Sequence, residues 1–180
     1  MDGIVDRLRV APGERRGDGA IRDSLARMLL AQPELRSCSL RTYTNARMEI
    51  LRDVRSASAG DIQVSVSDGV IVLEGHVISQ SHRRFAGVLA WWTPGRCDVV
   101  NSLAVRPDYE DRDDEVTEVL HLVLAADPTV DASQIRIQCR DKVVVLDGSV
   151  PTEPQKRRAE LDAWALFGVD RVVNRLQLTD

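Results

Sequence analysis

Cysteine, aromatic residues and long apolar runs are scarce in this chain of 180 residues. The three cysteines, Cys38, Cys97 and Cys139, are odd in number and show no CxxC or Cys/His spacing, so the sequence indicates neither a disulfide framework nor a zinc site. We expect reduced, mostly buried thiols. Neither a GXXG clamp nor a sheet-face aromatic motif occurs, and a net charge of −4 does not suit a surface that tracks phosphates, so we do not expect a nucleic-acid partner.

The N-terminus has no apolar run of the seven or more residues that a secretory signal needs, and no stretch anywhere is long enough to span a bilayer, so we expect no transmembrane segment. The expected location is the cytoplasm, including the periphery of the inner membrane, and the periplasm only if a leader has been removed.

Groups that would support catalysis are also missing from the pattern. His76, His82 and His121 are scattered, and no Ser/His/Asp, Cys/His, GxGxxG or Walker spacing is present. We therefore predict no enzyme activity, no catalytic or metal-binding residues and no cofactor.

What the chain does contain is an internal repeat. Residues 62–105 align with residues 135–178 at an offset of 73 without a gap, and 16 of the 44 pairs are identical, whereas chance gives about three. The chain is therefore two copies of one module.

The two first helices match at a different offset. Apolar residues at helical spacing begin near residue 18 and again near residue 115, and these segments match at an offset of 95. The first copy therefore contains about 22 extra residues between Ser37 and Asp61. Two predictions for this insertion stay open, a short extra helix after Thr44 or Asn45, and a strand over 39–44.

Each copy then shows a β-hairpin. Asp68-Gly69 is a strong two-residue turn signal. The second copy has Asp141-Lys142, and because lysine tolerates positive φ poorly, that turn is expected to be of another type or to carry strain. An asparagine inside each last strand predicts a bulge or a side-chain bond to a neighbouring loop.

The pattern as a whole predicts an α+β fold of two tandem αββαβ modules, with helices on one face of a small three-stranded sheet. The predicted organisation is a flexible lead-in over 1–17, module 1 over 18–107 with its insertion near 38–60, an acidic linker over 108–114 and module 2 over 115–180.

The repeated residues resemble the BON domain family, named for bacterial osmotically inducible and nodulation proteins. The resemblance covers about 160 residues and consists of a D-G-x-V-x-L-x-G-x-V hairpin, a helix with small residues four apart, and a final V-x-N-x-L strand. Its residues in the first copy are Asp68, Gly69, Val70, Val72, Leu73, Gly75, Val77, Ala86, Ala90, Gly95, Val99, Asn101 and Leu103, and in the second copy Asp141, Val143, Leu146, Gly148, Val150, Ala159, Ala163, Gly168, Val169, Val172, Asn174 and Leu176.

The resemblance implies a non-enzymatic module, often in tandem, that attaches to anionic phospholipid surfaces or to partner proteins in envelope or stress contexts. Independently of the family, the opening turns of the second helices are cationic, and a helix N-terminus with free amides and added bases can bind phosphate. The alternative is that these side chains only cover the surface with their stems packed down. The candidate lipid-headgroup residues are His82, Arg83, Arg84, Lys156, Arg157 and Arg158.

The second helices also carry an aromatic face. At 100° per residue, alanines four apart lie on one side of each helix, suited to close packing on the sheet, and a tryptophan lies nearly opposite. That face could be covered by the first helix, the other module, a second chain or a bilayer interface. The candidate interface residues are Val88, Trp91, Trp92, Leu161 and Trp164.

Charge is divided unevenly between the copies. Residues 1–107 carry 15 bases and 12 acids, about +3, and residues 108–180 carry 9 bases and 16 acids, about −7. Two hypotheses follow, weak binding of anionic phospholipid through the first copy, and a protein-interaction or assembly module that uses the second helices. The sequence leaves the lipid, the partner and the oligomeric state open.

Overall fold

The computed structural model describes residues 16–180 apart from 45–46, 57, 107–112, 167 and 180. Most of the predicted lead-in and most of the predicted linker lie outside the described residues. Asp113 and Asp114, which we assigned to the linker, belong to a helix.

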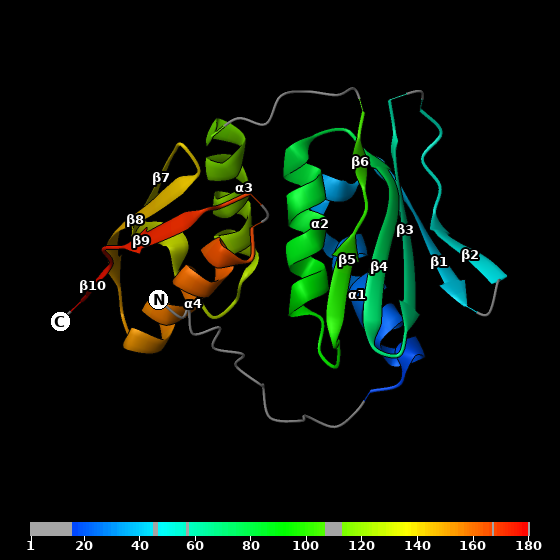
Figure 1. Ribbon diagram of the computed structural model, residues 1–180, viewed down its shortest axis with the longest axis horizontal. Helices are drawn as coiled ribbons and strands as arrows, with labels where there is room; N and C mark the ends of the chain where they lie inside the picture. The colour runs from blue at the N-terminus through cyan, green and yellow to red at the C-terminus, as the bar shows by residue number, and fades with distance from the viewer. Residues whose placement is uncertain (1–15, 45–46, 57, 107–112, 167, 180) are drawn as a thin grey trace, which may run out of the picture.

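Both modules contain a helix, a β-hairpin, a second helix and a final strand in this order (Figure 1), and module 1 has the additional strands β1 and β2 before its hairpin. This arrangement confirms the α+β fold of tandem modules. Module 1 consists of α1 (Asp18–Ala31), the 3₁₀ turn η1 (Pro33–Leu35), β1 (Cys38–Thr44), β2 (Arg47–Arg52), β3 (Gly60–Ser67), β4 (Val70–Val77), α2 (Gln80–Trp92), β5 (Asp98–Asn101) and β6 (Ala104–Val105). Module 2 consists of α3 (Asp113–Ala126), η2 (Ala132–Gln134), β7 (Ile135–Arg140), β8 (Val143–Val150), α4 (Glu153–Trp164), β9 (Arg171–Asn174) and β10 (Gln177–Leu178).

The insertion in the first copy forms two strands. The sheet order is β2-β1-β3-β4-β5, with β1 parallel to β3, β2 antiparallel to β1, and β6 continuing beside β4. Leu40 and Thr42 are buried on either side of the more exposed Arg41, as a period of two requires. The predicted extra helix is therefore wrong, and the predicted strand over 39–44 is correct.

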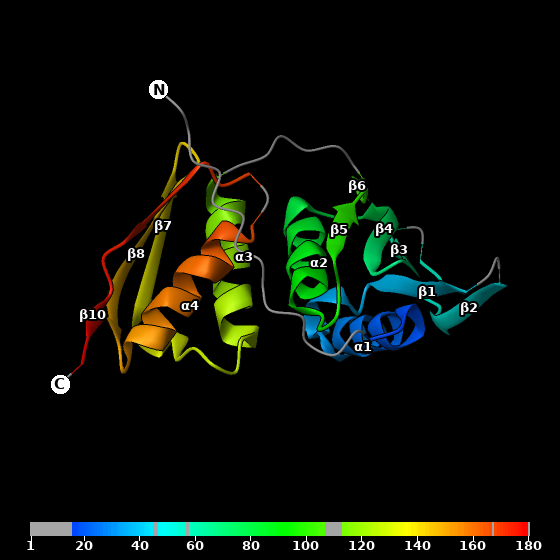
Figure 2. The same ribbon diagram turned by 60° about the horizontal axis from the view of Figure 1, so that its bottom comes forward.

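Module 2 keeps the shorter sheet that the pattern predicts. β7, β8 and β9 form its three main strands, and the two-residue β10 continues beyond β9 along β8. Figure 2 shows the helices of both modules between the two sheets, so the second helix of module 1 lies directly beside the first helix of module 2.

Asparagine side chains interrupt the last strand in both modules. Asn101 donates through Nδ2 to the carbonyl of Arg83 at 2.8 Å, and its Oδ1 accepts from the backbone N–H of Leu103. Asn174 repeats both bonds with Lys156 and Leu176. The predicted side-chain bond therefore exists, but it ties the strand to a helix instead of a loop.

The hairpin turns are held by the first residue of each first helix. The carboxylate of Asp18 accepts from the N–H groups of Asp68 and Gly69, and Asp113 accepts from the corresponding N–H groups at 141 and 142. These backbone hydrogen bonds lower the pKa of Asp113. The repeat at an offset of 95 pairs Asp18 with Asp113, so an alignment of the first helices could have revealed this clamp.

Candidate functional site

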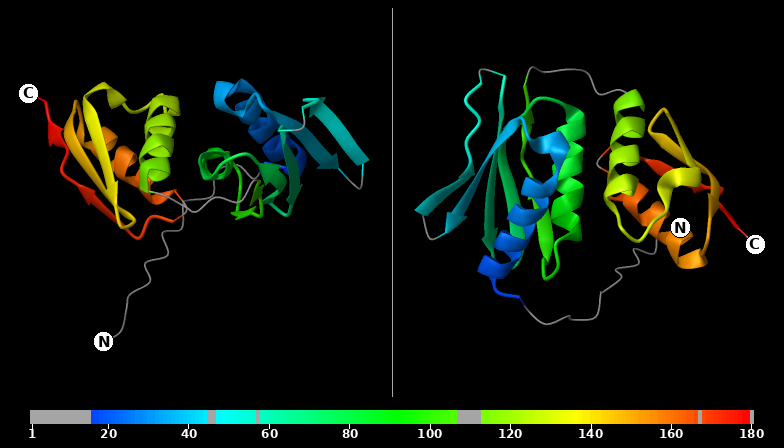
Figure 3. Two further views of the ribbon diagram at one scale, coloured as in Figure 1. Left: turned by 90° about the horizontal axis from the view of Figure 1, so that it is seen from above. Right: turned by 180° about the vertical axis from the view of Figure 1, so that it is seen from behind.

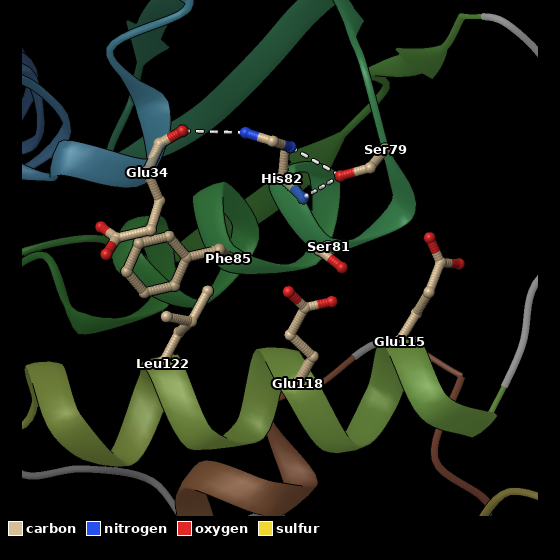
Figure 4. A pocket seen from close by; sticks show the side chains of 8 residues that line it. All are labelled: Glu34, Ser79, Ser81, His82, Phe85, Glu115, Glu118 and Leu122. Atoms are coloured by element: carbon tan, nitrogen blue, oxygen red, sulfur yellow. Dashed lines mark hydrogen bonds between the residues drawn. The ribbon is translucent and has the colours of Figure 1, made fainter.

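The N-terminus of α2 is capped and anchored inside the protein. The Ser79 side chain accepts from the His82 N–H, and His82 Nδ1 lies 2.6 Å from Ser79 Oγ (Figure 4). His82 Nε2 lies 2.8 Å from the carbonyl oxygen of Glu34 and donates to it, since a carbonyl only accepts. His82 therefore fixes α2 to η1 instead of presenting a free imidazole.

Acidic side chains surround this end of α2. A cleft of about 390 Å³ separates it from α3, and Figure 4 shows side chains of both modules along the cleft. The apolar floor is formed by Phe85 and Leu122, and the polar lining consists of Glu34, Ser79, Ser81, His82, Glu115 and Glu118. Three carboxyl groups around a helix N-terminus oppose the binding of an anionic headgroup.

The three bases predicted in the first copy do not form one exposed surface. Arg84 is only 4% exposed, and Arg83 and His82 are half-buried. The burial of Arg84 argues against a headgroup surface formed jointly by these three residues, and headgroup binding here stays a prediction.

The bases of the second copy are separated by the helix geometry. Arg157 is exposed and pairs with Glu153 one turn earlier at 3.2 Å, and Lys156 is half-buried. Arg158 lies on another face, where its Nε is 2.5 Å from Asp127 and 3.4 Å from Asp162. Of these three bases, Arg157 is the exposed one.

Arg158 belongs to a partly buried cluster at the contact between the modules. Its guanidinium lies 5.5 Å from the ring centroid of Trp92 in module 1. Burial raises the pKa of Asp162 to about 7, opposed by Arg158 and reinforced by the nearby Asp127 carboxylate. Burial also acts to raise the pKa of Asp127, but hydrogen bonds from Thr129 and Arg158 outweigh it and lower that pKa. No pattern in the sequence indicated this cluster.

The predicted interface residues divide into buried and exposed members. Val88 is fully buried and Trp92 half-buried, whereas Trp91, Leu161 and Trp164 are 39%, 59% and 46% exposed. Arg96 covers one side of Trp91 at 5.1 Å from the ring centroid. The structure therefore does not bring the five residues together on one surface.

Equivalent positions on the two second helices differ sharply in exposure. We define the α4 stripe as Pro154, Arg157, Leu161 and Trp164, which recur at helical spacing and are all exposed. Their counterparts at an offset of 73, the α2 stripe, are Ser81, Arg84, Val88 and Trp91. On α2, Arg84 and Val88 are buried.

Module 2 packs along α2 beside this stripe, and we call the contact between α2 and α3 the joint. Ser81 lines the cleft with α3, and Arg84 lies close enough to Cys139 of β7 to act on the pKa of that thiol. Helix α3 lies along α2 in Figures 1 and 2. Glu118 and Leu122 of α3 line the cleft beside Phe85, and Ala126 lines a second groove with Leu89 and Trp92. The sequence named the other module as one possible cover of the second helix, and Phe85, Leu89 and Trp92, which make α2 apolar nearly all round, favoured a buried helix.

The three cysteine thiols differ in how deeply they are buried. Cys38 is buried, Cys139 is half-buried and Cys97 is exposed, and all three are free. Burial raises the pKa of Cys139 to about 11, and the neighbouring Asp113 carboxylate acts in the same direction. The expectation of buried thiols is therefore wrong for Cys97.

The duplicated fold and the joint between its copies define a tandem α+β protein whose repeated polar residues hold secondary structure together. The profile of the BON domain family matches residues 40–107 and 112–180, and the chain belongs to this family. Among the described residues, no helix combines the length and apolar character that a bilayer span requires.

Similarity to a curated protein agrees with this assignment. The chain is 32% identical over 133 residues to osmotically inducible protein Y of Escherichia coli (strain K12). The match covers 71% of this chain and 66% of that protein, so about a third of the relative has no counterpart here.

Among solved structures, the C-terminal domain of CdsD, a structural protein of the type III secretion system of Chlamydia trachomatis, is 17% identical, with a TM-score of 0.32. The match covers 65% of this chain and 57% of that domain.

Proposed function

We propose that this chain is a non-catalytic assembly protein whose α4 stripe docks onto a helical face of a protein partner. The observation that carries the proposal is the contrast between the two stripes: Val88 on α2 is fully buried, whereas its counterpart Leu161 on α4 is 59% exposed. A large apolar residue beside an exposed tryptophan and an arginine has the composition of an interface centre. The same repeated surface is therefore largely buried on α2 and exposed to solvent on α4.

Several features support a role without catalysis. The repeated polar residues cap helices, clamp turns or tie strands to helices. In the acidic cleft, the Ser79 hydroxyl lies 2.6 Å from His82 Nδ1, but the same hydroxyl accepts the His82 N–H as the cap of α2, and His82 Nε2 is bonded to the Glu34 carbonyl, so this pair holds the helix end. The name of the relative favours a stress-related context for such an assembly role.

Cysteine labelling tests the proposal without knowledge of the partner. Two variants are made in a Cys97→Ser background, which removes the exposed native thiol. One is Leu161→Cys, and the control is Gln138→Cys at an exposed position on β7. Both are labelled with a thiol reagent in cells and after purification. We expect equal labelling of the dilute purified variants, and slower labelling of position 161 than of position 138 in cells. Equal labelling of both positions in cells would overturn the proposal.

A second candidate function is attachment to anionic phospholipid through the same helix. It is favoured by the exposed Leu161 and Trp164 with Lys156 and Arg157 nearby, a combination typical of helices at a membrane interface. The net charge of about −7 in residues 108–180 opposes it. In this case the chain would act as a peripheral protein.

Vesicle sedimentation separates the two candidates. If lipid is the partner, phosphatidylglycerol vesicles pellet the chain at low salt and protect the thiol of the Leu161→Cys variant from labelling. Lys156→Ala/Arg157→Ala then reduces pelleting, since each base contributes about 1 kcal/mol near such a surface. Arg136→Ala/Arg140→Ala, which removes two exposed bases from β7, is the charge-matched control. Absence of pelleting at low salt excludes the lipid candidate.

A further inference from the structure

The strand β2 ends the module 1 sheet with an unpaired edge. Among the described strands it pairs with β1 alone, in an antiparallel register that places Tyr43 opposite Met48. In Figure 1 it lies on the side of module 1 that faces away from module 2, and both views of Figure 3 show the same cyan strand at the outer end of the molecule. The outer backbone groups of β2 are therefore accessible to another strand.

β2 also exposes large apolar side chains. Met48 and Ile50 are 47% and 53% exposed, and because they are two residues apart they lie on one face of the strand. Tyr43 of β1 adds to this face, since its hydroxyl donates to the Met48 sulfur at 3.5 Å. A six-residue edge strand with exposed apolar side chains favours pairing with a strand of another chain.

The end strand of the module 2 sheet is protected against such pairing by its charges. β7 is unpaired on one side, and its exposed residues are Arg136, Gln138 and Arg140. If two copies of β7 paired antiparallel about Gln138, Arg136 of each copy would lie opposite Arg140 of the other, and like charges in that position destabilise a strand pair. β2 instead carries charges of both signs.

The charges of β2 are self-complementary in one register. Arg47 and Glu49 are exposed, and neither side chain forms a hydrogen bond or ion pair with another described residue. Residues opposite each other share a face of the sheet, so a symmetric antiparallel pair is centred on a residue. Centred on Met48, Arg47 of each copy lies opposite Glu49 of the other, whereas centring on Glu49 opposes two carboxylates and centring on Ile50 places Glu49 opposite Leu51. Charge therefore favours the register about Met48.

We propose that two copies of this chain associate through their β2 strands, paired antiparallel about Met48, so that the two six-stranded module 1 sheets form one continuous sheet. Main-chain hydrogen bonds between the strands provide the affinity, as in other cases of strand addition. The contact uses the same surface of both chains, so it is isologous and closes as a dimer. Two Arg47–Glu49 pairs set the register, and since they lie at the surface, salt weakens the association.

Charge-swap variants of the full chain test the partner and the register together. Glu49→Arg and Arg47→Glu each place like charges opposite each other, whereas the double variant Arg47→Glu/Glu49→Arg restores two opposite pairs with the signs exchanged. Arg136→Glu on β7 is the control for a charge change on an exposed end strand. All three positions are exposed, so the fold should survive, and thermal unfolding checks each variant.

Sedimentation velocity at increasing concentration is the measurement. We expect the unmodified chain, the double variant and the Arg136→Glu control to form a dimer as the concentration rises. Each single variant should stay monomeric at the same concentrations. An equimolar mixture of Glu49→Arg and Arg47→Glu should form a dimer again, because the two bases of one chain then lie opposite the two acids of the other.

Three outcomes would overturn the proposal. A monomeric unmodified chain excludes the second copy as the partner of β2. Dimers of both single variants, or a double variant that stays monomeric, place any self-association outside the register about Met48.

The same measurement distinguishes this contact from docking by the α4 stripe. Leu161→Glu changes the most exposed apolar residue of that stripe, and this variant should form a dimer like the unmodified chain. Loss of the dimer in Leu161→Glu would assign self-association to the second helix and refute the pairing of β2.

Discussion

Single positions in the repeat show how one fold was adapted to two environments. Phe85 and Leu89, which line the joint, correspond to Arg158 and Asp162 at the offset of 73. An apolar pair suits a helix that is covered by another module, whereas the charged pair forms a cluster with Asp127. The copies therefore diverge where the joint makes their surroundings different.

Asp162 makes the stability of the protein depend on pH. Its pKa is raised to about 7 by burial, whereas an unfolded chain releases this proton near pH 4, so the folded state binds more protons between about pH 4 and pH 7. The contribution of Asp162 to the free energy of unfolding is thus complete below about pH 4 and is lost as pH rises to about 7. Asp162→Asn, which keeps the shape of the protonated acid, should remove this slope and stabilise the protein at pH 8 by about 1–3 kcal/mol.

Urea unfolding of Asp162→Asn and the unmodified chain at several pH values measures this effect. The control is Asp131→Asn at a cap whose pKa is lowered by hydrogen bonds from Ser133, so its contribution changes with pH in the opposite direction. Parallel stability curves for Asp162→Asn and the unmodified chain would contradict the prediction.

Turns and helix ends repeat more faithfully than the residues that form them. In module 1 the hairpin turn has positive φ at Asp68 and Gly69, and in module 2 it has positive φ at Asp141 (49°) and Lys142 (61°). We expected the second turn to be of another type or to carry strain. It has positive φ at the same two positions as the first turn, so the strain at Lys142 is the correct alternative. The clamp from Asp113 to this turn helps to hold it in place.

Replacement of the strained lysine should stabilise the hairpin. Lys142→Gly is expected to raise the free energy of unfolding by about 0.5–1 kcal/mol, because glycine adopts positive φ without steric cost. The reverse change, Gly69→Lys, should destabilise by more, since a Cβ there would lie 2.8 Å from the Cys97 sulfur. Urea unfolding of both variants checks the pair, and a neutral or destabilising Lys142→Gly would show that the turn is not strained.

At the scale of the whole molecule, the joint makes two equivalent positions unequal. Val88 and Leu161 occupy the same place in the repeat, but only Val88 is buried. A buried, unpaired carboxylate is costly, whereas an exposed one is not. The same substitution should therefore have very different effects in the two modules.

Val88→Asp is expected to lower the free energy of unfolding by about 3 kcal/mol or more, and Leu161→Asp to change it by less than about 0.5 kcal/mol. Thermal or urea unfolding measures both. Similar losses in the two variants would mean that α3 does not protect the α2 stripe.

The sequence alone determined that the chain is a duplication, that each copy is an α+β BON module, and where its hairpins and second helices lie. It could do so because alternation, helical spacing and turn residues act locally, and because two copies carry the same signal. The insertion was decided in the tertiary structure: Leu40 and Thr42 form a strand because β3 offers an edge that completes their hydrogen bonds. Only tertiary packing could bury Arg84 and Val88 while leaving Arg157 and Leu161 exposed, because no local rule states which copy of a repeated face the neighbouring module will cover.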